Sequence, residues 1–379
     1  MRILELTNFS AGACGVWQRA FQESLELKKK GHNVLVLSSN SVKGSNEIAK
    51  EHEIIQGLEI KRFPFKKIGG ESFMRWLSKE AEKIIIGFKP EIIIAHAYRH
   101  LHTTRALKIA KKLKTSGTGA NCKIFLVTHA PFERERGLLQ ETVVLLYDNI
   151  IGRFSLKKFD KIIAITEWEI PYLKNLGLRE ENIIYIPNGI PNNFFIQKSA
   201  KEENKILYLG RISPIKNLQV LIKAMPLINN KEIKVEIVGP SEEEYKKKLD
   251  FLIKELDLDN RAIFYPPIYN LNEKIKKLDS CNIFILPSFS EGMPQSLVEA
   301  MTRRKIAIAS NNKGNSDIIE DKVNGFLFEI RNEKQLAEII NYCLDNKNQK
   351  FLENIRKNAE SSVLKFKWNK LINELESLF

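Results

Sequence analysis

The sequence predicts an α/β protein built from two doubly wound domains that face a central cleft. Three observations predict this fold. First, a chain of 379 residues exceeds the length at which one hydrophobic core usually stops growing. Second, short runs of β-branched residues alternate with longer amphipathic segments from end to end. Third, the short runs are apolar almost throughout, which is typical of parallel strands covered by helices on both faces.

The first half contains a series of short apolar runs that we expect to be strands. Helix-length segments separate most of them, for example 16–30, 72–87 and 138–159. The expected strands cover residues 3–6, 34–38, 59–63, 91–95, 123–128, 161–165 and 183–186.

The second half repeats this pattern after a segment dense in turn formers, Pro187-Asn188-Gly189-Ile190-Pro191. We therefore expect one domain over residues 1–187 and another over 188–364. Residues from about 365 to 379 have a helical pattern, and this helix could pack back on the first domain. The expected strands of the second domain cover residues 205–209, 234–238, 262–265, 282–286, 305–310 and 326–329.

The charge is positive and unevenly distributed. Residues 1–190 carry 30 Lys and Arg against 20 Asp and Glu, a net +10, whereas residues 191–379 carry 30 against 26, a net +4. A basic half attracts anions, such as a phosphorylated acceptor, nucleic acid or an anionic membrane surface. The alternative is a lysine-rich composition that serves solubility.

The sequence also limits the location of the protein. No apolar run approaches the roughly eighteen residues of a membrane-spanning helix, and the N-terminus begins a strand pattern without a signal peptide. Four scattered cysteines lack C-x-x-C spacing, so we expect reduced core residues and no metal site. These features predict a cytoplasmic protein.

The most informative segment is 287–301, which follows an expected strand and leads into a helix. Backbone amides near Gln295, Ser296 and Leu297 open that helix, where a diphosphate or a sugar oxygen can dock. Glu291 in the loop and Glu299 in the helix can accept hydrogen bonds from sugar hydroxyls, Glu299 from a ribose and Glu291 from a transferred sugar. The alternative is a helix with acids on its surface.

This segment resembles the E-x7-E motif of the retaining GT-B glycosyltransferases of family 4, the group 1 glycosyltransferases. The wording Leu-Pro-Ser-x-x-Glu-Gly-x-Pro-x-x-Leu-x-Glu-Ala-Met, residues 286–301, carries the resemblance. It implies two Rossmann-like lobes, a nucleotide-sugar donor held by the C-terminal lobe and an acceptor held by the N-terminal lobe. It also implies retained anomeric configuration, no cofactor and no obligatory metal. Donor contacts are expected from Gly292, Met293, Pro294, Gln295, Ser296 and Leu297.

A second match, 208–218, contains Gly210, Arg211 and Lys216 in a loop after a strand. Both cations can converge on one diphosphate and neutralise the charge that develops on the leaving group. In the family that this sequence resembles, the matching Arg and Lys act in this way. By itself, the pattern also fits a solvated basic loop.

In the first domain, Gly15 lies in a glycine-rich turn and aligns with a family position that approaches the donor phosphates. A tight strand-to-helix connection is the alternative. His129 follows a strand and is expected to contact the transferred sugar, unless it is a buried structural histidine. His96 resembles the first residue of an acceptor-side His-x-His, with Tyr98 in the second place. We expect no metal at His96, His100 and His102, because no acid accompanies them.

Cations and aromatic residues are mixed in Lys61-Arg62-Phe63-Pro64-Phe65-Lys66-Lys67, followed by Arg75-Trp76. This cluster could grip an anionic acceptor or rest on an anionic membrane surface, or it could be an ordinary solvated strand end. Asp257-Leu258-Asp259 matches a D-x-D pattern but is expected to be a turn.

Together these features predict a metal-independent transferase that moves a hexose or N-acetylhexosamine onto a glycan or lipid-linked acceptor. A nucleotide-sugar 2-epimerase on the same scaffold is the alternative, and a catalytically dead transferase is a further one. A nucleic-acid-binding protein is favoured only by the charge, so we expect no nucleic-acid partner. The protein could associate peripherally with the inner face of the membrane.

Overall fold

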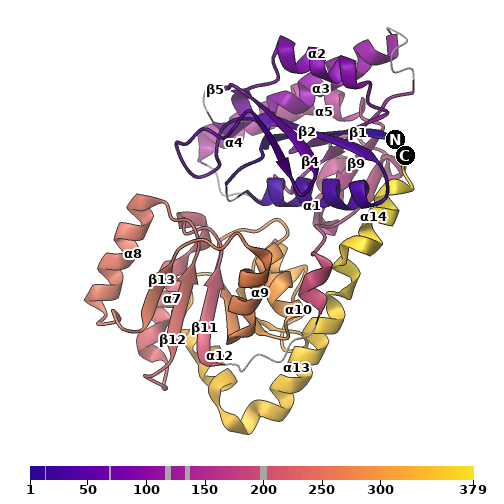
Figure 1. Ribbon diagram of the computed structural model, residues 1–379. Coiled ribbons are helices and arrows are strands. Elements are labelled where there is room, and N and C mark those ends of the chain that lie inside the picture. Colours follow the sequence, from indigo (N-terminus) through magenta and orange to yellow (C-terminus); the bar gives the residue numbers. More distant parts are fainter. Residues whose placement is uncertain (13, 68–69, 116–120, 133–136, 197–202) are drawn as a thin grey trace. The chain divides into compact units, whose positions relative to one another are not determined.

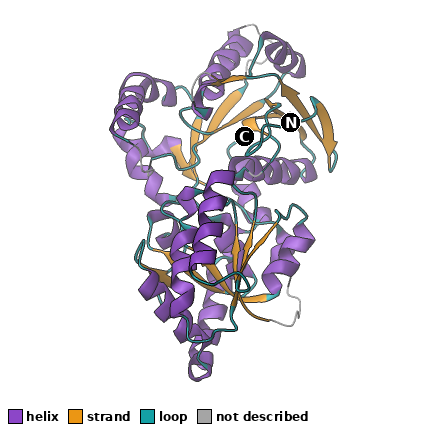
Figure 2. Ribbon diagram, turned by 90° about the vertical axis from the view of Figure 1, so that its left-hand side faces the viewer, coloured by secondary structure: helices purple, strands orange, loops and turns teal. Residues whose placement is uncertain are grey.

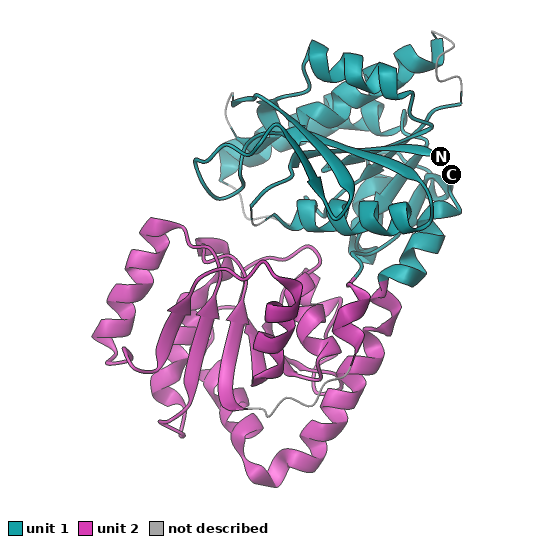
Figure 3. Ribbon diagram, in the orientation of Figure 1, with its two compact units in different colours: residues 1–189, 368–379 teal, residues 190–367 magenta. Residues whose placement is uncertain are grey.

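The structure, a computed structural model, describes residues 1–12, 14–67, 70–115, 121–132, 137–196 and 203–379. These residues form two compact units, coloured separately in Figure 3. The first unit contains Met1–Gly189 and Trp368–Phe379, and the second contains Ile190–Lys367. The division after Gly189 lies two residues beyond the expected boundary.

The first unit is built on an eight-stranded sheet of order β10-β9-β8-β7-β1-β2-β4-β3. Neighbouring strands are parallel, except that β3 runs antiparallel to β4. A two-stranded hairpin, β5 (Lys66–Lys67) and β6 (Met74–Arg75), stands apart from this sheet. The sheet strands are β1 (Arg2–Phe9), β2 (Asn33–Ser39), β3 (His52–Ile55), β4 (Leu58–Phe63), β7 (Ile92–His96), β8 (Lys123–Val127), β9 (Lys161–Ala164) and β10 (Ile183–Tyr185).

Helices flank this sheet (Figure 2). The C-terminal helix α14 (Trp368–Glu376) packs against α1, and Glu376 accepts a hydrogen bond at 2.9 Å from Nε2 of His32, which follows α1. The other helices are α1 (Gly15–Lys29), α2 (Lys79–Phe88), α3 (Leu101–Thr115), α4 (Leu138–Tyr147), α5 (Arg153–Leu156) and α6 (Ile170–Asn175), with a π-helical turn, Asp148–Gly152, between α4 and α5.

One expected helix, 72–87, begins later than the sequence suggested. The Ser78 hydroxyl accepts a hydrogen bond from Ala81 N at 3.2 Å, so this serine caps α2 and fixes its start at Lys79. Before the cap, Trp76 is buried and its indole N–H donates to Asn8 Oδ1 at 2.9 Å. The indole thus finds its polar partner in the sheet, and its segment is extended rather than helical.

The second unit is built on a six-stranded parallel sheet of order β13-β12-β11-β14-β15-β16 (Figure 1). Its strands are β11 (Glu203–Leu209), β12 (Lys234–Val238), β13 (Ala262–Tyr265), β14 (Cys281–Leu286), β15 (Ile306–Ser310) and β16 (Phe326–Phe328). Its helices are α7 (Leu218–Ala224), α8 (Glu243–Glu255), α9 (Leu271–Asp279), α10 (Gln295–Thr302), α11 (Lys313–Ser316), α12 (Glu333–Leu344) and α13 (Gln349–Ser362).

The strands are apolar on both sides, as expected for sheets covered by two helical layers. Ile93, Ile94, Ile283 and Phe284 have no exposed surface. The prediction of two doubly wound parallel sheets is therefore confirmed. Among the described residues, no helix combines the length and apolar character needed to cross a bilayer.

Candidate functional site

In the second sheet, the strand order reverses between β11 and β14. At such a switch point the loops that leave the carboxyl ends of two neighbouring strands diverge and open a crevice for ligands. The loop after β11 carries Arg211 and Lys216, and the loop after β14 carries Glu291. The topology therefore brings together the two segments that the sequence singled out separately.

The loop after β11 is held close to the loop after β12. Tyr208 OH donates to Arg211 O at 2.7 Å. Gly239 has φ of 151°, and a Cβ there would lie 1.9 Å from Gly210 O, so only glycine fits. The Arg211 side chain is partly exposed and lies 3.9 Å from Glu242. Gly239 was missed because the sequence gives no sign that two loops cross there.

Lys216 and Glu291 form an ion pair of 2.5 Å. Ser288 Oγ donates to the same Glu291 oxygen at 2.5 Å. The two loops are joined beneath the pair by a hydrogen bond from Phe289 N to Ile215 O at 2.9 Å. A cation and a carboxylate from different loops are thus held in contact on a fixed backbone.

The segment that leads into α10 presents backbone amides at the same edge. Leu297 N and Val298 N both donate to Pro294 O, so the expected free amide at Leu297 is already used. Gln295 N and Ser296 N have no backbone acceptor among the described residues. Amides of this kind at the start of a helix are the groups to which anions bind.

The loop 291–294 leaves little room for side chains beneath it. A Cβ at Gly314 would lie 2.4 Å from both Glu291 O and Gly292 O. Met293 and Pro294 are buried. Gly314 therefore allows α11 to support the loop from below, and substitution there would displace Glu291.

Glu299 is nearly buried and forms an ion pair of 2.5 Å with Lys274 from α9. Burial raises the pKa of Glu299, and the nearby Lys274 counteracts this. The sequence did not point to Lys274, because it lies in a lysine-rich helix with no motif. The pair gives Glu299 a fixed position at the second turn of α10.

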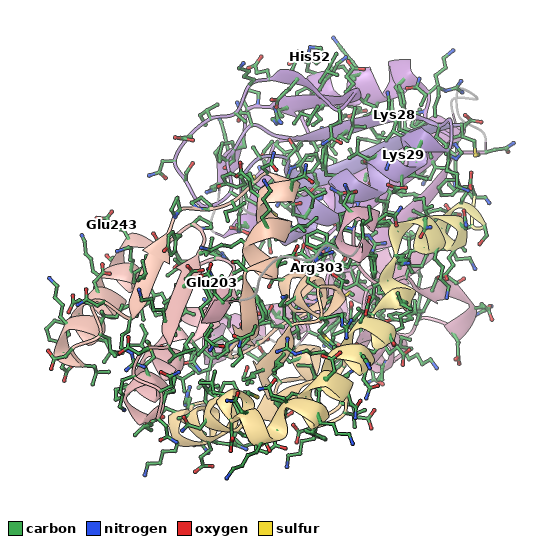
Figure 4. The ribbon with its side chains drawn as sticks, turned by 60° about the horizontal axis from the view of Figure 1, so that its bottom comes forward. Lys28, Lys29, His52, Glu203, Glu243 and Arg303 are labelled. Carbon is green, nitrogen blue, oxygen red and sulfur yellow. The ribbon has the colours of Figure 1, made fainter. Side chains whose placement is uncertain are left out.

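The C-terminal end of α10 is anchored by Arg303, which is labelled in Figure 4. Its guanidinium binds both Asp279 oxygens, at 2.6 and 2.9 Å, and donates to Phe194 O at 2.9 Å. Arg304, next in the chain, adopts a left-handed conformation with φ of 56°. Glycine adopts this left-handed conformation more easily than arginine does.

In the first sheet, the order reverses between β1 and β7. His96 ends β7, and its Nε2 lies 2.7 Å from Glu5 Oε2 on β1. Its Nδ1 lies 3.0 Å from Nε2 of His129, which follows β8. Burial lowers the pKa of His96 to about 4, so its ring is neutral at physiological pH.

This arrangement differs from the expected role of His96. The ring has no exposed surface and both nitrogens have partners, so His96 has no face to offer an acceptor directly. It supports His129 instead. His129 itself is only partly covered.

The His129 loop has strained backbone. His129 and Ala130 both have positive φ, 63° and 49°. Glu169 holds the loop in place, because it accepts hydrogen bonds from the Thr128 hydroxyl and from Ala130 N. Burial raises the pKa of Glu169 to about 7, although these hydrogen bonds oppose the shift. A strained backbone that surrounding contacts hold in place is typical of a functional loop.

A buried polar network behind His96 was not foreseen from the sequence. Arg19 on α1 donates to Glu23 Oε2 at 2.7 Å and to Pro187 O at 2.7 Å. Burial raises the pKa values of Glu5 and Glu23, against the attraction of Arg19. Glu5, Glu23 and His96 approach within a cation's reach of one another. Arg19 already supplies positive charge there, so the cluster is a hydrogen-bonded network.

The two glycines Gly12 and Gly15, at the turn before α1, have different roles. Gly12 has φ of 80°, and a Cβ there would lie 2.3 Å from Lys43 O, so the turn requires glycine. A Cβ at Gly15 would meet no atom within 4 Å. Packing therefore does not require glycine at 15, which leaves room for a ligand to approach the backbone.

The cation-aromatic cluster at 61–67 is divided between the core and the surface. Arg62 is buried and pairs with Glu53 at 2.8 Å, and Phe63 and Trp76 belong to the core. Pro64, Lys66, Lys67 and Arg75 are exposed, and Phe65 is partly exposed. Phe63 and Trp76 are therefore not available to a membrane or an acceptor, and the exposed cations and Phe65 remain at the surface. Asp257 has positive φ at a turn, as expected for the D-x-D segment.

Two family profiles match most of the chain. The profile "Glycosyltransferase Family 4" matches residues 14–194, and "Glycosyl transferases group 1" matches residues 189–362. The two profiles meet close to the division between the compact units.

Similar proteins include transferases of known and unknown specificity. An uncharacterized glycosyltransferase of Haemophilus influenzae is 33% identical over 49% of this chain and 52% of its own length. The N,N'-diacetylbacillosaminyl-diphospho-undecaprenol alpha-1,3-N-acetylgalactosaminyltransferase of Campylobacter jejuni is 26% identical over 58% of this chain and 60% of its own length. The chain thus spans little more than half the length of these curated relatives.

Among solved structures, Anabaena Alr3699/HepE in complex with UDP and glucose superposes with a TM-score of 0.76. The similarity covers 100% of this chain and 98% of that one, at 19% sequence identity. At this identity the similarity establishes the fold, which is GT-B as predicted.

Proposed function

Because the chain belongs to the group 1 glycosyltransferases of the GT-B fold, we propose that it transfers a sugar from a nucleotide-diphosphate sugar to a glycan or lipid-linked acceptor. The second unit binds the donor and the first unit binds the acceptor. The Lys216–Glu291 pair at the switch point of the second sheet carries the proposal. The names of the relatives describe transferases, which favours transfer over 2-epimerisation.

The diphosphate of the donor binds Arg211, Lys216 and the free amides that open α10. Without donor, Glu291 neutralises Lys216. A bound diphosphate takes over Lys216, and the Glu291 carboxylate becomes available for hydroxyls of the transferred sugar. As the bond between sugar and diphosphate breaks, negative charge builds on the leaving group, and the two cations stabilise it without requiring a metal.

Glu299 binds the ribose of the donor. Its carboxylate is held by Lys274, so it is oriented before the nucleotide arrives. Two hydroxyls on neighbouring ribose carbons match the two oxygens of a carboxylate. Gly210 and residues 292–297 surround the same donor, and we assign Gly15 to the donor phosphates because of the sequence resemblance alone.

His129 contacts the transferred sugar, and His96 holds the His129 ring. The transfer retains the anomeric configuration, and the leaving phosphate oxygen takes the acceptor's proton. His129 therefore positions the sugar and is not a general base. A lipid-linked acceptor places the enzyme at the cytoplasmic face of a membrane as a peripheral protein, with no nucleic-acid partner.

Thermal-shift measurements with UDP, GDP, ADP and their sugar conjugates test the donor site. We expect one nucleotide family to raise the melting temperature of the wild-type chain and to leave that of Glu299→Ala nearly unchanged. Transfer is then measured as release of that nucleotide in the presence of candidate acceptors. The proposal fails if no nucleotide stabilises the chain, or if the chain binds DNA in a salt-sensitive way that nucleotide sugars do not affect.

A further inference from the structure

An unusual concentration of exposed apolar side chains lies between Leu138 and Phe154. Of the 21 large hydrophobic residues that are exposed in the described part of the chain, eight fall within this stretch. Leu138 is 91% exposed and Leu139 is 80% exposed. Single exposed apolar residues are ordinary, but a contiguous patch marks a binding surface.

Five of these residues lie on one helical face. The stretch runs through α4, the π-helical turn and the start of α5. Leu139, Val143, Leu146, Ile150 and Phe154 follow one another at steps of three or four residues, the spacing of neighbours on one side of a helix. A helix of a globular unit normally turns such a stripe toward the core. Here the stripe faces outward, and we call it the apolar stripe.

The opposite face explains why the stripe cannot turn inward. Asp148 is buried and accepts from both Arg99 Nη2 at 2.6 Å and Tyr98 OH at 2.9 Å. A Cβ at Gly152 would lie 2.0 Å from Tyr98 OH, so the helix packs directly on that tyrosine. A buried charge pair and a close backbone contact therefore fix the orientation of the stretch.

The same contacts connect the stretch to the candidate acceptor loops. Tyr98 and Arg99 follow His96 at the end of β7, and Arg99 Nη1 also donates to Pro131 O at 2.8 Å in the His129 loop. The apolar stripe is thus attached to the two loops that we assign to the sugar and its acceptor.

The charges around the stripe favour an anionic partner. Arg153, Lys157 and Lys158 are exposed at its C-terminal end. Between 138 and 158 the acidic residues are Glu141 and Asp148, and Asp148 is neutralised by Arg99. An apolar face bordered by lysine and arginine is typical of helices that lie in the interface of an anionic bilayer.

We infer that the apolar stripe inserts into the interfacial layer of an anionic membrane, with Arg153, Lys157 and Lys158 at the lipid head groups. Membrane binding by the stripe does not depend on the proposed function. Only its purpose, to bring a lipid-linked acceptor to the first unit, rests on that function. Vesicle binding does not depend on turnover. Failure of the docking surface and failure of the transferase assignment are therefore distinguishable.

Co-sedimentation of the full chain with phosphatidylcholine vesicles, with and without phosphatidylglycerol, tests the inference. We expect binding to the anionic vesicles that weakens at high ionic strength. Leu146→Gln/Ile150→Gln should weaken it about 100-fold, roughly tenfold for each large apolar side chain removed from the bilayer. The matched control is Ile48→Gln/Ile54→Gln, which removes two similarly exposed residues of the same unit and should bind as wild type.

Three outcomes would overturn the inference. The wild-type chain could fail to bind at low ionic strength, or the Leu146/Ile150 variant could bind as tightly as the control. The wild-type chain could also be a dimer that this variant dissociates, without vesicle binding, and the stripe would then join two copies of the chain.

A spectroscopic reporter covers the case in which the double variant is unstable. Phe154→Trp places an indole on the stripe, and Phe251→Trp places one on an exposed site of α8. On anionic vesicles, the emission of the first should shift to shorter wavelength and the emission of the second should not. An unshifted Phe154→Trp spectrum on bound protein contradicts insertion of this face.

Discussion

Replacing Lys216 by alanine should reduce turnover severely while the fold remains intact. The Lys216–Glu291 pair is mostly but not fully buried, with side-chain exposures of 18% and 11%. Breaking a fully buried pair costs about 3–5 kcal/mol, whereas an exposed pair is worth under about 1 kcal/mol. We therefore expect a stability loss of about 1–2 kcal/mol, which a domain stable by about 5–15 kcal/mol tolerates.

The catalytic effect should be larger than the stability effect. Removing one preorganised positive group from a site where charge develops lowers kcat by about 100- to 1,000-fold. The assay is steady-state release of the nucleotide, with denaturant unfolding measured in parallel. Because the two residues interact, Lys216→Ala/Glu291→Ala should cost less stability than the sum of the single changes, by about 1 kcal/mol.

Lys246→Ala is the matched control. It breaks an ion pair of 2.7 Å with Asp250 in the same unit, but both side chains are substantially exposed. We expect neither turnover nor stability to change measurably. Wild-type turnover in Lys216→Ala, or an equal loss in the Lys246 control, would refute the reasoning.

Three further predictions concern other parts of the site. Glu299→Ala should weaken nucleotide binding about 10- to 100-fold in calorimetric titrations, because charged hydrogen bonds to the ribose are lost; unchanged affinity would remove Glu299 from the ribose site. Because burial raises the pKa of Glu169 from 4.5 to about 7, the folded chain holds a proton between these pH values that the unfolded chain releases. Stability from this group is therefore complete below pH 4.5 and declines by about 3 kcal/mol as the pH rises to 7. Unfolding free energies at pH 5 and 8 should show this decline in the wild-type chain and not in Glu169→Gln; equal slopes would contradict the assignment. Gly12→Ala should lower the melting temperature by several degrees. Gly15→Ala should leave the melting temperature unchanged and raise KM for the donor. A lower melting temperature for Gly15→Ala would mean that Gly15 serves only the turn.

The sequence predicted the two parallel sheets because their strands are apolar on both faces. It also singled out the two segments that we assign to the donor, since the sequence around Glu291 and Glu299 is specific and Arg211 and Lys216 follow a strand. The side chains that complete the site were not predictable. Lys274 reaches Glu299 from a helix with no motif of its own, and the two are brought together only by packing.

The burial of other side chains could not be predicted, because a sequence pattern does not show which residues the fold covers. The sequence around Arg62 and Trp76 suggested a basic and aromatic surface, but both side chains are buried. Conversely, the sequence predicted a helix-length segment over 138–159 and did not show that its apolar residues would be exposed. Asp148 pairs with Arg99 in the π-helical turn and fixes the orientation of the stretch that follows α4.

The central claim is that a nucleoside diphosphate binds at the switch point of the second sheet. A crystal structure of the chain with the nucleotide that gives the largest thermal shift tests it most directly. We predict the diphosphate against Lys216 Nζ and the amides of Gln295 and Ser296, with the ribose on Glu299. A nucleotide bound elsewhere, with the Lys216–Glu291 pair unbroken, would contradict the account.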